Sequence, residues 1–184
     1  MVALHSTALA SAGLTLPAEY LVPRWYAVHT CPRHEKRVAE QLSGKNVEHF
    51  LPLYEAVHRW KDRRAKVQLP LFPGYIFVHI ALKDRLQVLE IPSIVQIVSF
   101  RGQPSCLPQR EIDALRNGLA NRLRAEPYPY LKVGRRVRVR SGPLFGAEGI
   151  LLRKKDTFRL VLSLELIMRS VAVEVDVADV EPLP

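Results

Sequence analysis

Cysteine is scarce in this sequence, with only Cys31 and Cys106 among 184 residues. Two cysteines exclude the disulfide framework of a small secreted domain. No apolar run approaches the roughly 18 residues that a membrane-spanning helix needs. The opening Met1–Gly13 lacks the charged start and solid apolar block of a signal peptide. We therefore expect residues 1–23 to be a disordered leader, and the protein to be cytoplasmic with no membrane contact.

Catalytic motifs are also missing. No glycine-rich loop ends in Gly-Lys-Ser/Thr, and no Gly-x-Ser-x-Gly sequence occurs. Cys31 lies between His29 and His34, but no second Cys or His pair of zinc-finger spacing follows. The carboxylates show no pairing that sequence spacing alone supports. The sequence therefore predicts no catalytic residues, no bound metal and no cofactor.

Positive charge, in contrast, is abundant: 27 basic residues face 18 acidic ones, a formal net charge of +9. A surplus of this sign attracts DNA, RNA or acidic protein faces. Most of the surplus positive charge lies between residues 24 and 124, so we expect that part of the chain to contact the polyanion. The basic segment Arg59–Lys66 is a candidate for phosphate contacts, and a solvated charged loop is its alternative interpretation. The candidate nucleic-acid-binding residues are Arg33, Lys36, Arg37, Arg59, Trp60, Lys61, Arg63 and Arg64.

Residues 24–124 alternate strand-like and helix-like patterns, which indicates an α+β domain with helices packed on an antiparallel sheet. One helix is expected between Thr30, as its N-cap, and Gly44, and another after Pro108 with an inward face of Ile112, Leu115 and Leu119. A short helix is expected around Leu82, Leu86 and Leu89. The strands are expected at Trp25–His29, Val47–Leu53, Lys66–Leu69, Tyr75–Ile80 and Ile94–Val98.

The end of the chain has a different character. The segment Glu126-Pro-Tyr-Pro-Tyr130 places two prolines where they block helix and strand, so residues 125–131 are expected to be a stiff linker. Beyond it, Arg136–Arg140 and Val171–Val177 alternate apolar with polar residues, as strands do. Glycine turns separate several such segments. We therefore expect residues 132–184 to form a small all-β barrel whose closure removes its edges.

The most unusual segment is Pro70-Leu-Phe-Pro-Gly-Tyr-Ile-Phe77. A strand seldom begins behind two prolines and several large apolar residues unless that corner packs on something. Ordinary core packing is one explanation. The other is an exposed apolar patch that docks on another protein.

Taken together, these segments resemble the NusG family of transcription factors from Trp25 onward. The run Phe72-Pro-Gly-Tyr-Ile-Phe-Val78 is similar to the signature of the family's N-terminal NGN domain. The segment from Val137 through Gly142-Pro-Leu-Phe-Gly-Ala-Glu-Gly149 resembles the KOW motif of its C-terminal barrel. The resemblance implies a ferredoxin-like NGN fold followed by an SH3-like KOW barrel.

The resemblance also implies a function in transcription elongation and antitermination. The N-terminal domain is expected to bind the clamp helices of the largest RNA polymerase subunit through Trp25, Phe72, Pro73 and Tyr75. It is expected to suppress pausing or termination by favouring the active state of the polymerase over the paused one, without catalysing a reaction. Basic residues on the same domain would face upstream DNA or the non-template strand. The protein is expected to be a monomer.

In this family the KOW domain recruits Rho or a small-subunit ribosomal protein through a loop that often carries an aromatic residue. Here the expected partner-binding residues are Ile167, Met168 and Arg169, and the missing aromatic argues against Rho. The strict alternation at Val171–Val177 argues against a KOW domain that switches to helices, as RfaH's does.

A subtype is suggested as well. Four segments are most similar to operon-specific UpxY-type and RfaH-type factors: Arg33-His-Glu-Lys-Arg37, Leu51-Pro-Leu53, Trp60-Lys-Asp-Arg63 and Pro70-Leu-Phe-Pro73. Two rival interpretations are a ribosomal KOW protein that binds RNA and a nuclease. The first leaves the Phe72–Tyr75 segment unexplained, and the second needs a carboxylate cluster for which the sequence gives no spacing signal.

Overall fold

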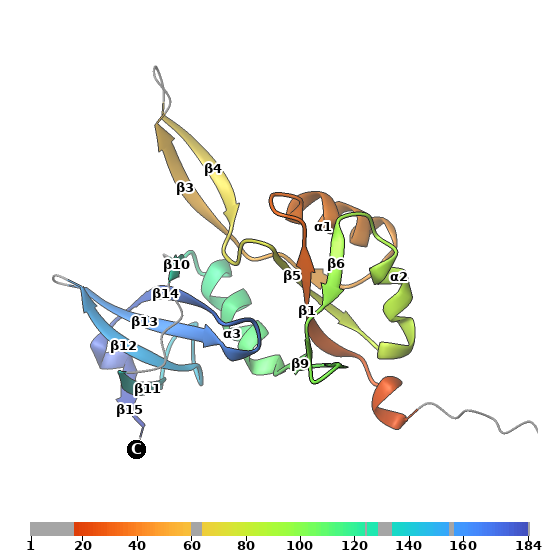
Figure 1. Cartoon of the computed structure of the whole chain (residues 1–184). Coiled ribbons are helices and arrows are strands. Elements are labelled where there is room, and N and C mark those ends of the chain that lie inside the picture. Colours follow the sequence, from red (N-terminus) through yellow and green to blue (C-terminus); the bar gives the residue numbers. More distant parts are fainter. Residues whose placement is uncertain (1–16, 60–63, 124, 129–133, 155–156, 184) are drawn as a thin grey trace, which may run out of the picture.

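A computed structural model describes residues 17–59, 64–123, 125–128, 134–154 and 157–183 (Figure 1). The N-terminal sheet is built on β1 (Arg24–Thr30), which pairs antiparallel with β5 (Tyr75–Ile80) on one side. Along its other side β1 pairs with β6 (Ile94–Ile97) and β9 (Cys106–Leu107). The short β2 (His49–Phe50) pairs with β5 at the outer edge. An antiparallel sheet was expected here, and this expectation is confirmed.

Helices cover both faces of this sheet. On one face, α1 (Glu35–Gly44), η2 (Leu82–Asp84) and α2 (Arg85–Leu89) pack over Tyr26 and Val28 of β1. On the other face, α3 (Gln109–Ala120) packs over Trp25 and Ala27. Successive residues of a strand point to opposite faces, so β1 supplies both cores.

One local expectation for this domain was wrong. Thr30 is the buried last residue of β1, and α1 begins only at Glu35, after Arg33 takes a left-handed φ of 65°. The short helix expected around Leu82, Leu86 and Leu89 is confirmed as η2 and α2. The outer face of α2 exposes Leu86 and Leu89, whereas Val88 is buried, because a helix this short buries only one side.

The expected leader is partly ordered. Within residues 17–23, Ala18–Tyr20 forms a 3-10 turn, η1, which lies beside η2, and Tyr20 packs on the core that contains Tyr26 and Val28. Residues 1–16 of that leader lie outside the described residues.

A hairpin stands apart from the sheet. Its strands are β3 (Leu53–Arg59) and β4 (Arg64–Pro70), which pair only with each other and project away from the body of the protein (Figure 1). The expected strand at Val47–Leu53 is therefore divided between β2 and the start of β3. A second, smaller hairpin joins β7 (Ser99–Phe100) to β8 (Gln103–Pro104).

The C-terminal sheet is antiparallel throughout and has the order β10-β14-β13-β12-β11-β15. The all-β expectation is confirmed, but the pairing runs from one end strand to the other rather than round a closed ring. Short 3-10 turns precede β14 and β15: η3 (Glu165–Ile167) and η4 (Val177–Asp179). The strands are β10 (Ala125–Tyr128), β11 (Arg135–Val139), β12 (Glu148–Lys154), β13 (Thr157–Leu164), β14 (Arg169–Val175) and β15 (Val180–Pro182).

The expected linker is therefore partly a strand. Residues Ala125–Tyr128 pair in register with Val173 to Ser170 of β14. Proline is tolerated there because β10 is the end strand of the sheet, where a missing N–H group costs no ladder hydrogen bond.

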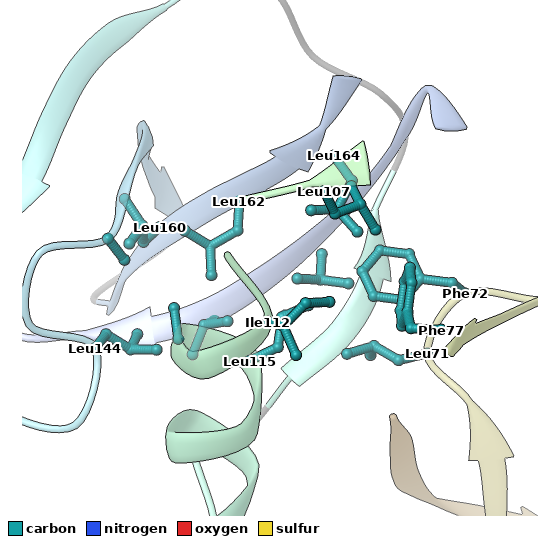
Figure 2. Close-up of a cluster of buried hydrophobic side chains, with 14 of the residues drawn as sticks. Leu71, Phe72, Phe77, Leu107, Ile112, Leu115, Leu144, Leu160, Leu162 and Leu164 are labelled. Atoms are coloured by element: carbon teal, nitrogen blue, oxygen red, sulfur yellow. The ribbon is translucent and has the colours of Figure 1, made fainter. Parts of the chain in front are cut away.

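The two sheets share one apolar core with α3 between them (Figure 1). Figure 2 shows Ile112 and Leu115 of α3 lying between Leu71, Phe72 and Phe77 of the N-terminal domain and the leucines of β13. We call this packing of the C-terminal sheet on α3 and the N-terminal domain the closed arrangement. In the closed arrangement α3 and the N-terminal domain cover the apolar face of the C-terminal sheet. A separate small barrel would cover that face with its own side chains.

Candidate functional site

The residues Phe72–Tyr75, which we call the aromatic corner, turn the chain from the hairpin into β5. Gly74 has a φ of 82°, a conformation that favours glycine, and a Cβ there would lie 3.7 Å from the ring of His29. The N–H of Gly74 donates a 2.7 Å hydrogen bond to Oε1 of Glu35, a carboxylate buried in the first turn of α1. Its carbonyl accepts a 2.9 Å bond from the N–H of Thr30. The corner is therefore fixed to both α1 and β1.

The sequence did not single out Glu35. Its position in a charged segment, Arg33–Arg37, is typical of a solvated helix face, and only the return of the chain at Gly74 brings a donor to it. A buried carboxylate is costly unless it is hydrogen-bonded, so this contact explains why the side chain is buried.

The side chains of the aromatic corner differ in exposure. Phe72 is 1% exposed and packs edge-on against Phe77, with ring centroids 5.6 Å apart. Tyr75 is half-buried and Pro73 is exposed. The expectation of an exposed apolar patch is therefore wrong for Phe72 in the closed arrangement, because the C-terminal sheet and α3 cover it.

Trp25 is more deeply buried than a residue that contacts a partner at the protein surface. It is 2% exposed and stacks on His79 at 5.0 Å between ring centroids. Its Nε1 donates a 2.9 Å hydrogen bond to Gln109 of α3, and the guanidinium of Arg116 lies 4.6 Å from its ring. Trp25 is thus buried by its own domain, and it supports the candidate site without lying on its surface.

Glu48 links the polar groups beside Trp25. It accepts hydrogen bonds from Nδ1 of His79, at 2.8 Å, and from Arg116, at 3.3 Å. Burial raises the pKa of Glu48, but hydrogen bonds and charge from His79 and Arg116 outweigh it, so this pKa lies below the ordinary value. The four side chains form one network that holds α3 on the sheet.

The contact between α3 and the C-terminal sheet is tight at one point. A Cβ built on Gly118 would lie 3.0 Å from Cδ2 of Leu144, a buried residue in the turn between β11 and β12. Glycine inside a helix is less favourable than alanine by about 1 kcal/mol. Close approach of the two domains is the physical reason that this helix contains one.

A cavity of about 720 Å³ lies beside this contact. Its walls come from Phe72, from the first turns of α3, and from β11, β12 and β13. Charged side chains line it from both domains: Arg110 and Glu111 on one side, and Arg136, Glu148 and Glu165 on the other. The interface between the domains is thus apolar around Leu115 and Leu162 and charged where Arg110, Glu111, Arg136, Glu148 and Glu165 line the cavity.

The expected partner-binding residues of the C-terminal domain are spread over different environments. Ile167 is 5% exposed and belongs to the shared core, whereas Met168 is 59% exposed at a left-handed φ of 49°. Arg169 is exposed, and its Cζ lies 5.9 Å from the ring centroid of Tyr75. Sequence reasoning missed Phe145, which is 74% exposed at the turn where Leu144 is buried. The adjacent aromatic and leucine did not reveal which of the two would point outward.

The candidate nucleic-acid-binding residues are only partly described. Arg33, Lys36 and Arg37 are exposed at the start of α1. Arg59 and Arg64 are paired in the backbone at the far end of the β3–β4 hairpin. Trp60, Lys61 and Arg63 lie outside the described residues.

No group of three or more His, Cys, Asp or Glu side chains suited to a metal occurs within the described ranges. Over those same ranges, every helix is too short or too polar to cross a membrane.

Comparisons with known proteins agree with this architecture. The family model described as "Transcription termination factor nusG" matches residues 23–116. The transcription termination/antitermination protein NusG of Vibrio vulnificus (strain CMCP6) is 29% identical over 175 residues, covering 87% of this chain and 96% of the relative. Its counterpart in Escherichia coli (strain K12) is 29% identical over 174 residues, covering 86% of this chain and 95% of the relative.

A solved structure, "Domain interaction in Thermotoga maritima NusG", superposes with a TM-score of 0.56 at 22% identity. It covers 90% of this chain and 99% of that one, which supports the two-domain fold. Fold and site together define a protein with an α+β N-terminal domain and an antiparallel C-terminal sheet. The chain belongs to the NusG family and is a NusG-type transcription termination/antitermination factor, not an enzyme. Membership in this family implies that it binds RNA polymerase.

Proposed function

We propose that the N-terminal domain docks on the clamp helices of the largest RNA polymerase subunit through Phe72, Pro73 and Tyr75. Trp25 has a supporting role, since Gln109, Arg116 and His79 enclose it. The observation that carries the proposal is the position of Phe72. Its ring lines a cavity between domains, so removal of the C-terminal sheet would uncover it.

Docking on the polymerase then requires that the closed arrangement opens. A partner that binds only the open arrangement shifts the population towards it by its differential affinity, with no chemical step. The open protein suppresses pausing or termination by favouring the active state of the polymerase. The monomer is sufficient for this mechanism, because the aromatic corner and the C-terminal sheet belong to the same chain.

DNA contact is proposed for the basic residues of the same domain. Arg33, Lys36 and Arg37 are exposed at the start of α1, whose first turn is also linked to the aromatic corner through Glu35 and Gly74. Upstream DNA or the non-template strand would lie along this side, and the β3–β4 hairpin, with the paired Arg59 and Arg64 at its far end, would reach further along the nucleic acid.

The C-terminal domain would recruit a second partner, the small ribosomal subunit or Rho, once it is released. In the closed arrangement Ile167 is buried and Arg169 lies on Tyr75. Opening would therefore free the polymerase-binding face and the partner-binding loop together. The operon-specific subtype has less support, since the relatives compared above are named as NusG proteins without such a restriction.

Binding to purified core polymerase tests the proposal. The native chain should be retained on immobilised polymerase, and Phe72→Ala combined with Tyr75→Ala should abolish retention. Circular dichroism checks that the double variant stays folded, and Phe145→Ala, which removes an exposed ring elsewhere, is the control that should bind normally. Retention of the double variant would place the docking face elsewhere. Binding of the native chain to ribosomes but not to polymerase would favour the ribosomal alternative.

A further inference from the structure

Two carboxylates from different domains line the charged side of the interdomain cavity. Glu111 lies in the first turn of α3 and is half-buried, and Glu165 opens η3 in the C-terminal domain. Both line the cavity. Within the described part of the chain, neither carboxylate has a salt-bridge partner.

The electrostatic coupling between these groups crosses the interface. Burial raises the pKa of Glu111, the neighbouring Arg110 lowers it, and the charge of Glu165 raises it further, with a net upward shift. The ionised form of Glu111 is thus disfavoured in the closed arrangement, partly by a residue that leaves when the domains separate.

The attraction of Arg110 for Glu111 is larger than the repulsion by Glu165, but Arg110 lies beside Glu111 on α3 and stays with it when the domains separate. Arg136 of β11 lies 3.8 Å from Glu148 of β12, so its charge is already shared within the C-terminal sheet. A hydrogen bond from Arg138 is the main cause that lowers the pKa of Glu148, and Arg110 contributes a smaller attraction from across the interface. The first turn of α3 therefore meets one attractive carboxylate, Glu148, and one repulsive carboxylate, Glu165.

We propose that Glu165 is a built-in opening charge, whose repulsion of Glu111 weakens the closed arrangement so that a partner binding at the aromatic corner can displace the C-terminal sheet. The apolar core between the domains favours closure, and the repulsion between Glu111 and Glu165, which line the same cavity beside that core, opposes it. The consequence for polymerase binding rests on the function proposed above, whereas the effect on closure does not.

The pH dependence has a definite sign. Because closure raises the pKa of Glu111, the closed arrangement binds a proton more tightly than the open one. The contribution of this group to closure is complete below its ordinary pKa and is lost as the pH rises through the raised pKa. Raising the pH across this acidic range should therefore open the native protein. The pKa of Glu148 is lowered, so its effect on closure has the opposite pH dependence. Most of this lowering comes from Arg138 in the same sheet and persists after opening.

Fluorescence energy transfer between the two domains measures closure directly. Dyes are attached to cysteines placed at the exposed positions Lys83 and Glu181, after Cys31 and Cys106 are replaced by serine. Glu165→Gln should raise the ratio of closed to open protein roughly two- to fivefold, as expected for loss of a partly solvated charge contact. Glu111→Gln should raise the ratio more, because it also removes the burial penalty of this carboxylate, and adding Glu165→Gln to it should gain little further.

Two controls sharpen the test. Glu40→Gln removes a carboxylate from the exposed face of α1, away from the cavity lining, and should leave the ratio unchanged. High salt should bring the closed fractions of the native protein and Glu165→Gln closer together, because it screens the repulsion in which they differ. A Glu165→Gln protein with the native closed fraction, or additive effects of the two Gln changes, would overturn the proposal.

Polymerase binding separates this inference from the proposed function. If both hold, Glu165→Gln should bind core polymerase two- to fivefold more weakly than the native chain, in proportion to its extra closure. If neither protein binds polymerase, the proposed function is refuted, and the energy-transfer ratios alone still decide the role of Glu165.

Discussion

The guanidinium of Arg169 lies over the ring of Tyr75, with its Cζ 5.9 Å from the ring centroid. The two residues come from different domains. We assign Tyr75 to the polymerase-binding face and Arg169 to the partner-binding loop of the C-terminal domain. While they are in contact, each reduces access to the other. Binding at either site should therefore promote binding at the other by the same factor, because the coupling between two binding equilibria is reciprocal.

Replacing Arg169 and replacing Tyr75 should have opposite effects on polymerase binding. Arg169→Ala removes a cation–π contact worth about 0.5–1 kcal/mol, so it should favour opening and tighten binding roughly two- to fivefold. Tyr75→Ala removes the same contact together with a polymerase-binding ring, and it should weaken binding. Surface plasmon resonance on immobilised core polymerase measures both. Equal losses of affinity in the two variants would show that their contact does not oppose docking.

Gly118→Val should open the protein without unfolding it. Valine adds bulk where even a Cβ would lie 3.0 Å from Cδ2 of the buried Leu144. The clash is across the domain interface, so the domains can relieve it by separating. Interdomain energy transfer should fall in Gly118→Val and recover when Leu144→Ala is added, because the second change makes room. Unchanged energy transfer in Gly118→Val would mean that the interface accommodates the valine without separation of the domains.

Glu35→Ala should destabilise the aromatic corner. It removes the buried acceptor of the Gly74 N–H, and an unsatisfied buried donor costs about 1–3 kcal/mol. Glu35→Gln keeps an acceptor oxygen and should lose less of the unfolding free energy, measured by urea denaturation. Glu40→Ala, an exposed change in the same helix, should stay within about 0.5 kcal/mol of the native value. A Glu35→Ala protein as stable as Glu40→Ala would show that the corner does not need this bond.

Replacing Arg33, Lys36 and Arg37 by alanine should flatten the salt dependence of binding to elongation complexes. Each lost phosphate contact removes about 0.7–0.9 from the slope of log affinity against log salt, so a drop of about 2–3 is expected if all three touch phosphates. Lys83→Ala combined with Arg101→Ala lowers the net charge from exposed positions outside α1 and should leave the slope nearly unchanged. The same slope in the native and triple-variant proteins would exclude these three residues as DNA contacts.

Short-range patterns predicted much of the N-terminal domain. The strand at Tyr75–Ile80 has the expected bounds, and Ile112 and Leu115 form the buried face of α3. These elements are set by periodic apolar residues that are buried whichever neighbour covers them. Thr30 was misplaced as a helix cap because the extended pairing of β1 continues through it, and tertiary pairing overrides a local capping preference.

The relation between the domains could not be predicted from the sequence. The apolar face of β13 has the same pattern whether it fills a barrel or covers α3, so alternation alone did not distinguish the two. For the same reason the sequence left open whether Phe72 is packed in a core or exposed for docking. Gly118 was the one local hint, since a glycine within a helix marks close approach, but its partner Leu144 lies 26 positions away in the sequence.

If the C-terminal sheet covers the face that binds polymerase, separating the domains should strengthen binding, and the affinity of purified core polymerase for three proteins tests this. These are the native chain, Gly118→Val and Gly118→Val with Leu144→Ala. We expect tighter binding by Gly118→Val than by the native chain, with a return towards the native affinity in the double variant. Equal affinity of all three proteins, with energy transfer confirming that Gly118→Val is open, would contradict it.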